Sequence, residues 1–134
     1  MSAENPNKPL YQKLGIEADH YAAVVNPPDN YFELLQGNIE QQKVLEGLHK
    51  GRFDVIHYFV EDKEKINFSI MEAMFSITPW GMIWISWPKK SSTNKNGYSE
   101  DLIRKAALKL GLVDVKVCYV DEKWSALKLV YRKK

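Results

Sequence analysis

Cysteine is almost absent from this sequence of 134 residues: Cys118 is the only one, so no internal disulfide can form. A cysteine-rich zinc site is excluded as well, and the three histidines, His20, His49 and His57, do not fall at a metal-ligand spacing such as i, i+4. No apolar run approaches the ~20 residues of a membrane helix, and the first ten residues contain no apolar signal core. We therefore expect a cytoplasmic protein without a bound metal.

The sequence also lacks the glycine-rich turns that bind nucleotides. In parallel sheets such a turn follows the first strand, where its backbone N–H groups approach a phosphate. Here the corresponding turn is Asn26-Pro27-Pro28-Asp29, which has no glycine and contains two residues without an N–H. We expect no cofactor, and we predict that the protein does not bind S-adenosylmethionine or NAD tightly.

Charge is close to balanced overall but uneven along the chain. The formal net charge is +2, with 7 basic and 12 acidic residues in positions 1–88 and 12 basic and 5 acidic residues in positions 89–134. The basic half either forms an ordinary solvated face or faces an anion. It lacks the dense basic stripe of a nucleic-acid binder, so any contact with nucleic acid should be weak and non-specific.

Apolar runs and turn signals predict strands and helices in alternation. We expect strands at 21–25, 53–60, 82–87, 113–120 and 126–131, and helical segments at 10–14, 30–37, after Asp62 and at 99–110. The core stripe of the helix after Asp62 should consist of Ile66, Ile70, Met74 and Phe75, and Leu102 should lie on the inner face of the last helix. Pro79-Trp80-Gly81 predicts a turn. Residues 42–45 fit a strand, but Ile39, Leu45 and Leu48 also fit a helix.

Strands that alternate with helices predict a single three-layer, Rossmann-like α/β domain over residues 10–134, preceded by a flexible tail at 1–9. Asp121 to Ser125 form a link short enough for an antiparallel hairpin. The first four strands should run in one direction and the strand at 126–131 against them. This mostly parallel sheet with an antiparallel end resembles the second half of a methyltransferase fold with its first half trimmed.

The strongest local signal for a site is Ser86-Trp87-Pro88-Lys89-Lys90, because two lysines follow directly after a buried strand. Parallel sheets bind ligands at the carboxyl ends of their strands, and a small anionic ligand would suit these lysines. Alternatively, the lysines only solubilise a loop. The other residues that we expect at this edge are Asn26, Glu61, Asp62, Asp121, Glu122, Trp124 and Ser125. His57 lies in a central apolar strand, where it is either a functional group or a structurally satisfied one.

Several segments resemble a family of short bacterial proteins known only as a domain of unknown function. They are Lys13-Leu-Gly-Ile16, Asp54-Val-Ile-His57, the segments 84–90 and 110–118, and 120–132, so the similarity spans roughly residues 9–133. The resemblance implies no activity. Its motifs lie largely along the expected edge of the sheet, which adds weight to the candidate residues there.

Three functions remain open at this point. The first is a non-catalytic binding domain that holds a small anionic ligand or a protein partner at the carboxyl edge of the sheet. The second is a reduced methyltransferase-like transferase, and the third is weak, non-specific association with nucleic acid. We lean against an enzyme, because the chain has no nucleophile motif and Cys118 lies within an apolar strand. A homodimer is compatible with each of the three.

Overall fold

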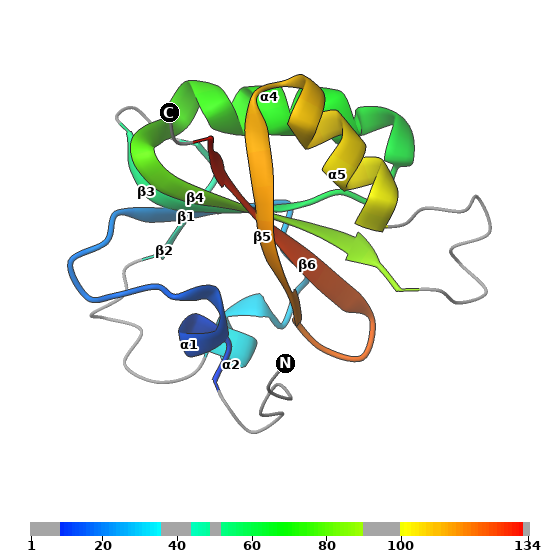
Figure 1. The fold of residues 1–134 in the computed structure, drawn as a ribbon. Helices are drawn as coiled ribbons and strands as arrows, with labels where there is room; N and C mark the ends of the chain where they lie inside the picture. Colours follow the sequence, from blue (N-terminus) through cyan, green and yellow to red (C-terminus); the bar gives the residue numbers. More distant parts are fainter. Residues whose placement is uncertain (1–8, 36–43, 49–51, 90–99, 133–134) are drawn as a thin grey trace.

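A computed structural model describes residues 9–35, 44–48, 52–89 and 100–132. These residues form one six-stranded sheet in the order β2-β1-β3-β4-β6-β5, with helices on both faces (Figure 1). The elements in chain order are α1 (Leu10–Leu14), β1 (Ala22–Val25), α2 (Tyr31–Leu35), β2 (Val44–Glu46), β3 (Phe53–Phe59), the 3-10 turn η1 (Lys63–Lys65), α4 (Ile66–Ser76), β4 (Ile77–Pro88), α5 (Glu100–Lys109), β5 (Leu112–Tyr119) and β6 (Trp124–Tyr131).

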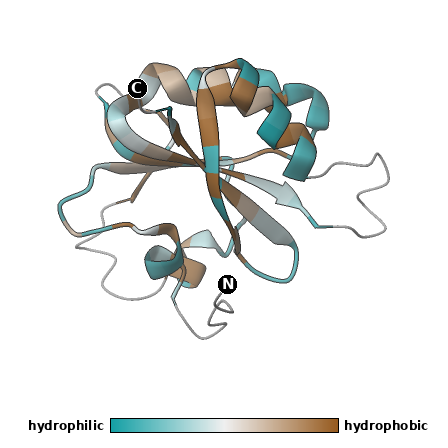
Figure 2. Ribbon diagram, in the orientation of Figure 1, coloured by the Kyte–Doolittle hydropathy of each residue, from teal (hydrophilic) through white to brown (hydrophobic). Residues whose placement is uncertain are grey.

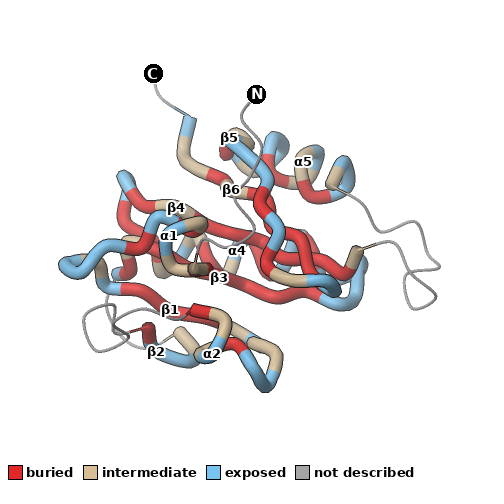
Figure 3. Tube along the Cα trace, turned by 90° about the horizontal axis from the view of Figure 1, so that it is seen from below, coloured by how far each residue is buried: buried red, intermediate tan, exposed pale blue. Residues whose placement is uncertain are grey.

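The sheet separates two hydrophobic cores. One core lies between the sheet and helices α4 and α5 and includes Ile70 and Ile103, while the other lies beneath α1 and α2 and includes Leu14 and Tyr31. Buried residues run through β1, β3 and β4, which carry apolar side chains on both faces (Figure 3). The three-layer α/β architecture expected from the sequence is therefore confirmed.

Strand directions also agree with the sequence. β2, β1, β3 and β4 pair in parallel, β6 pairs antiparallel with β4, and β5 pairs antiparallel with β6. Because residues 120–123 are the whole link between β5 and β6, these two strands form a hairpin. Val44–Glu46 is a strand, so the strand interpretation is the correct one for the described part of residues 42–45.

Helix α5 shows how charge and burial fix an element. Its hydrophobic and hydrophilic residues alternate along the ribbon (Figure 2), and Ile103 and Ala107 are fully buried. Arg104 bonds with Asp114 of β5 at 2.9 Å and also pairs with Glu100 one turn earlier, which ties the helix to the sheet. Leu102, expected on the inner face, is 37% exposed, so that detail of the prediction is wrong.

The predicted turn at Pro79-Trp80-Gly81 is wrong, because β4 continues from Ile77 to Pro88. Phe53 pairs with Ile77 and Val55 with Met82, so residues 78–81 of β4 bulge opposite the single residue Asp54. The turn-like sequence of this segment therefore corresponds to a bulge within β4, and the segment stays in the sheet.

Other expectations have mixed outcomes. Asp62 caps the next helical segment as expected, since its Oδ1 accepts from the Glu64 N–H at 3.1 Å. Phe75 was expected in the core but is 82% exposed, and Met74 is partly buried.

The tail at 1–9 lies outside the described residues apart from Pro9. In the described part of the chain, no helix has the length and apolar character needed to cross a membrane.

Candidate ligand-binding pocket

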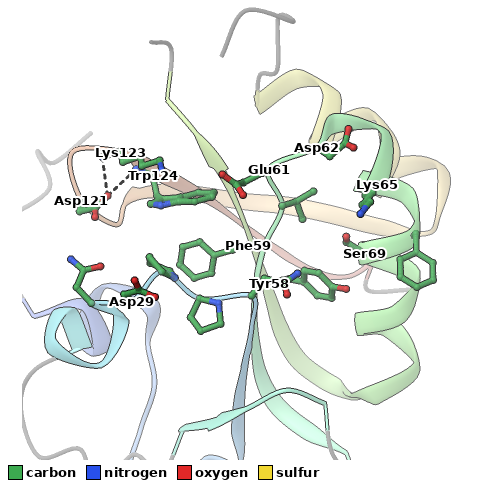
Figure 4. A pocket seen from close by; sticks show the side chains of 16 residues that line it. Asp29, Tyr58, Phe59, Glu61, Asp62, Lys65, Ser69, Asp121, Lys123 and Trp124 are labelled. Atoms are coloured by element: carbon green, nitrogen blue, oxygen red, sulfur yellow. Dashed lines mark hydrogen bonds between the residues drawn. The ribbon is translucent and has the colours of Figure 1, made fainter. Parts of the chain in front are cut away.

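A pocket of about 850 Å³ lies at the carboxyl edge of the sheet, where β1 and β3 end and β6 begins (Figure 4). Parallel α/β sheets place their ligands at this edge, because the loops that leave the strands there surround an open crevice. The lining residues come from the turn after β1, the end of β3, the start of α4 and the β5–β6 turn. They are Asn26, Pro27, Pro28, Asp29, Asn30, Tyr58, Phe59, Val60, Glu61, Asp62, Lys65, Phe68, Ser69, Asp121, Lys123 and Trp124.

The turn after β1 forms one wall. Asn26 has a φ of 56°, the only positive φ of a non-glycine residue in the described part of the chain, and this conformation turns the backbone sharply out of β1. Pro27 and Pro28 follow, and the carbonyl of Pro28 accepts from the N–H of Tyr31 at 3.0 Å as α2 begins. This wall is rigid but offers no backbone N–H at positions 27 and 28.

The β5–β6 turn forms the opposite wall. Asp121 Oδ1 accepts from the backbone N–H groups of Lys123 and Trp124, both at 2.9 Å, so the carboxylate fixes the shape of the turn. The Trp124 ring meets the ring of Phe59 edge to face, with centroids 4.9 Å apart. Lys123 Nζ lies 5.7 Å from the Trp124 ring centroid, so a cation already lies over this indole.

Helix α4 contributes the third side. The Tyr58 hydroxyl, at the end of β3, donates to Glu72 of α4 and also bonds with Ser69. Burial, followed by the contact with Glu72, raises the pKa of Tyr58 to about 12, so the hydroxyl keeps its proton at neutral pH. Lys65 lies beside Ser69 at this end of the pocket (Figure 4). None of the ion pairs found within the described residues involves Lys65.

Acidic side chains outnumber basic ones in this lining. Asp29, Glu61, Asp62 and Asp121 face two lysines, which gives the lining a formal charge of −2 at pH 7. The acids are not evenly spread. Asp29, Glu61 and Asp121 lie toward the end formed by Trp124, whereas Lys65 lies toward α4 (Figure 4). The negative charge of the lining is therefore concentrated at the Trp124 end.

A smaller pocket of about 410 Å³ adjoins the β5–β6 turn on the α1 and α2 side of the sheet. Its lining consists of Lys13, Leu34, Lys89, Tyr119, Val120, Asp121 and Glu122. Both lysine side chains contact Tyr119. Lys13 Nζ donates to the Tyr119 carbonyl at 3.1 Å, and Lys89 Nζ lies 4.6 Å from the Tyr119 ring centroid. The two acids balance the two lysines, so this pocket has no excess charge.

The residues predicted for the site therefore separate into groups. Five of them line the large pocket, namely Asn26, Glu61, Asp62, Asp121 and Trp124, while Lys89 and Glu122 line the small one together with Asp121. Ser125 does neither, because it is 4% exposed within β6 and pairs with neighbouring strands. Lys90 lies outside the described residues.

His57 lies in a buried polar network that lines neither pocket but packs behind Phe59 of the large one, since the His57 and Phe59 rings are stacked with centroids 4.3 Å apart. Its Nδ1 is 2.9 Å from the Tyr31 hydroxyl and its Nε2 is 2.6 Å from Ser86 Oγ, and all three side chains are buried. Burial lowers the pKa of His57 to about 3, so the ring is neutral at neutral pH. The network joins α2, β3 and β4, which supports the structural interpretation of this histidine.

Sequence reasoning missed most of the pocket. Asp29, Tyr58, Lys65, Ser69 and Lys123 line it without having been expected there. The spacing of Lys65 and Ser69, four residues apart at the start of a helix, places both on one helix face directly after a strand end. That signal was present but weak, because the same spacing is common on solvated helices.

Comparison with solved structures identifies the class of fold. The chain is similar to a methyltransferase from Pyrococcus furiosus, with a TM-score of 0.56, 16% identity, and coverage of 95% of this chain and 86% of that one. It is also similar to the magnesium protoporphyrin IX methyltransferase of Synechocystis PCC 6803 with bound SAM, with a TM-score of 0.59, 10% identity, and coverage of 84% and 70%. A third neighbour is the CcbJ methyltransferase of Streptomyces caelestis, with a TM-score of 0.57, 7% identity, and coverage of 92% and 88%. The domain therefore has a methyltransferase-like α/β fold.

Sequence comparison identifies the family within this class. Residues 13–133 match the family described as "Protein of unknown function (DUF3052)", and the chain belongs to that family. A search of curated proteins finds no significant match. The resemblance to a family of unknown function is thus confirmed, and the shared fold by itself assigns no reaction.

A methyltransferase-like fold raises the question of whether S-adenosylmethionine fits. In nucleotide-binding α/β folds the backbone of the turn after the first strand approaches the cofactor, and an acid at the end of the second strand binds the ribose. Here that turn contains Pro27 and Pro28, and Glu46 at the end of β2 is exposed and does not line the large pocket. The residues present do not fit the cofactor in that mode.

Proposed function

We propose that the protein is a non-catalytic binding domain whose large pocket holds a small molecule with a positively charged group. The observation that carries the proposal is the lining of this pocket, in which four carboxylates and two lysines surround a fixed aromatic pair. The proposed site is at the expected edge of the sheet, but the proposed ligand is positively charged rather than anionic, because an anion would be repelled by the excess of carboxylates.

The charged group of the ligand would lie between Glu61 and Trp124. Glu61 is exposed, its side chain points toward the Trp124 end, and it contributes no hydrogen bond to the fold among the described residues. The Trp124 ring already carries the ammonium of Lys123 near its face, and aromatic faces attract cations. Carboxylate and ring together would replace part of the hydration of an ammonium group.

Binding rather than catalysis is proposed because the lining offers no nucleophile with a base beside it. Neither histidine nor cysteine occurs among the lining residues that the structure describes. Ser69, the one lining hydroxyl group besides Tyr58, is 2% exposed and bonds with that tyrosine. General-base activation of an attacking group would require a partner within hydrogen-bond reach.

Three probes of equal chain length test which charge the pocket prefers: hexylamine, hexanol and hexanoate. The binding of each is followed by NMR at the indole N–H of Trp124. Hexylamine should shift this signal at lower concentration than hexanol, and hexanoate should not shift it. Glu61→Gln should weaken the effect of hexylamine, and the control Glu64→Gln should leave it unchanged, because Glu64 lies one turn away and outside the pocket. Equal shifts from hexanoate and hexylamine, or no shift from hexylamine, would overturn the proposal.

The reduced methyltransferase-like transferase is the second candidate, and its support is the shared fold. It requires a cofactor mode that does not use the turn after β1. Calorimetry with S-adenosylmethionine separates the two candidates. Low-micromolar binding would favour the transferase, whereas its absence would favour the binding domain.

A further inference from the structure

The large pocket has two ends of different chemistry. At the Trp124 end lie three carboxylates and Lys123, so the formal charge is −2, and at the α4 end lie Asp62 and Lys65, so the formal charge is zero. Asp62 is partly committed to the fold, because its Oδ1 accepts from the N–H of Glu64. Among the described lining residues, the ammonium of Lys65 is the one positively charged group of the α4 end.

Two hydroxyl groups at the α4 end are already bonded within the protein. Ser69 and Tyr58 lie beside Lys65 and carry hydroxyl groups (Figure 4). Because burial and Glu72 raise the pKa of Tyr58, its hydroxyl stays protonated and uncharged. Tyr58 donates this proton to Glu72, and Ser69 bonds with Tyr58, so the N–H groups of Lys65 are the donors that can meet a ligand carboxylate.

From this separation of charge we infer that the ligand is a dipolar molecule of the amino-acid type, with its ammonium group at Asp29, Glu61 and Trp124 and its carboxylate at Lys65. The inference rests on the proposed function and adds the second charge and the orientation. A zwitterion offers an oppositely charged partner to the carboxylates at one end of the pocket and to Lys65 at the other, which a simple amine would not do.

The experiment compares hexylamine with 6-aminohexanoate, which have the same ammonium group and chain length but differ at the far end. In the wild-type protein 6-aminohexanoate should bind about fivefold more tightly, the upper range for one partly exposed ion pair. Lys65→Gln should remove this difference by weakening 6-aminohexanoate alone. The matched control is Lys105→Gln, since Lys105 is exposed on α5 and lines neither pocket.

Glu61→Gln provides the second arm, because it should weaken both probes by the same factor. Tighter binding of hexylamine than of 6-aminohexanoate, or equal binding, would overturn the inference and leave the proposed function intact. The same holds if Lys65→Gln weakens both probes equally. Binding of neither probe to the wild-type protein would overturn the proposed function and the inference together.

Discussion

Acid should destabilise this protein through one buried imidazole. His57 is 1% exposed, its pKa is lowered to about 3 by burial, and both ring nitrogens have hydrogen-bond partners in Tyr31 and Ser86. In the unfolded chain the same side chain has a pKa of about 6.5. Protonation therefore favours the unfolded state at any pH between these two values.

The sign and size of the effect follow from linkage. Above about pH 6.5 the ring is neutral in the folded and in the unfolded state, so it does not make the free energy of unfolding depend on pH. Below about pH 6.5 the unfolded chain binds a proton that the folded protein does not bind. Each pH unit in this window lowers the free energy of unfolding by about 1.4 kcal/mol, so the loss from His57 at about pH 4.5 is about 3 kcal/mol. That is a large share of the roughly 5–15 kcal/mol that stabilises a domain.

Urea denaturation at pH 7 and at about pH 4.5 measures this loss in the wild-type protein, in His57→Gln and in His20→Gln. Glutamine does not titrate, so the variant at position 57 should lose about 3 kcal/mol less than the wild-type protein over this interval. His20 lies in the loop before β1, outside the buried network, so His20→Gln is the matched control for replacing a histidine by glutamine.

NMR supplies a readout that does not depend on how stable the variant is. The ring of His57 should remain neutral in the folded wild-type protein down to about pH 4.5. Burial also raises the pKa of Tyr31, so its hydroxyl keeps its proton. The neutral ring then has one protonated nitrogen, and Tyr31 and Ser86 each bond with one of the two ring nitrogens. Titration of the folded ring between pH 6 and 7 would refute the reasoning.

Three further predictions concern the fold. Gly81→Ala should destabilise the protein by about 1–3 kcal/mol in urea denaturation, because a Cβ there would lie 2.9 Å from the backbone oxygen of Asp54; a neutral result would contradict the close approach. Phe75→Ala should change stability by less than about 0.5 kcal/mol and Ile70→Ala by about 2–5 kcal/mol, measured in the same way; comparable losses would mean that Phe75 is buried. Asp121→Ala should cost about 1–2 kcal/mol and the asparagine variant less, since an amide oxygen still accepts in the turn; equal losses would exclude this role.

The central strands were predictable because their sequences fit no other element of secondary structure well. β3 and the second half of β4 are apolar on both faces, which only a strand covered on both sides satisfies. The bulge in β4 was not predictable, because Pro79-Trp80-Gly81 has the local signature of a turn. The segment continues as a strand because β4 pairs with β3 on both sides of the bulge, where Asp54 also accepts from the Trp80 indole N–H at 3.2 Å. Such pairing between strands is tertiary and cannot be read from the local sequence.

The helix faces show a second limit of sequence patterns. Ile66 and Ile70 were placed correctly by their spacing, but Phe75 follows Met74 directly and points away from the sheet. Phe75 lies 100° around the helix from Met74, so both cannot occupy the centre of one stripe. Hydrophobicity alone favoured Phe75, although helix geometry leaves room for only one of the two.

The position of the pocket followed from the strand ends, but its charge depended on the strand order. Lys89 was expected at the centre of the site because it follows β4. β6, however, inserts between β4 and β5, and the N–H of Lys89 donates to the Lys123 carbonyl at 2.8 Å, which holds Lys89 against the β5–β6 turn and in the smaller pocket. The turns after β1, β3 and β5 then supply the large pocket, and each of them carries an acid. Which turns meet is a property of the sheet order, and for that reason the excess of acid in the lining emerges only from the structure.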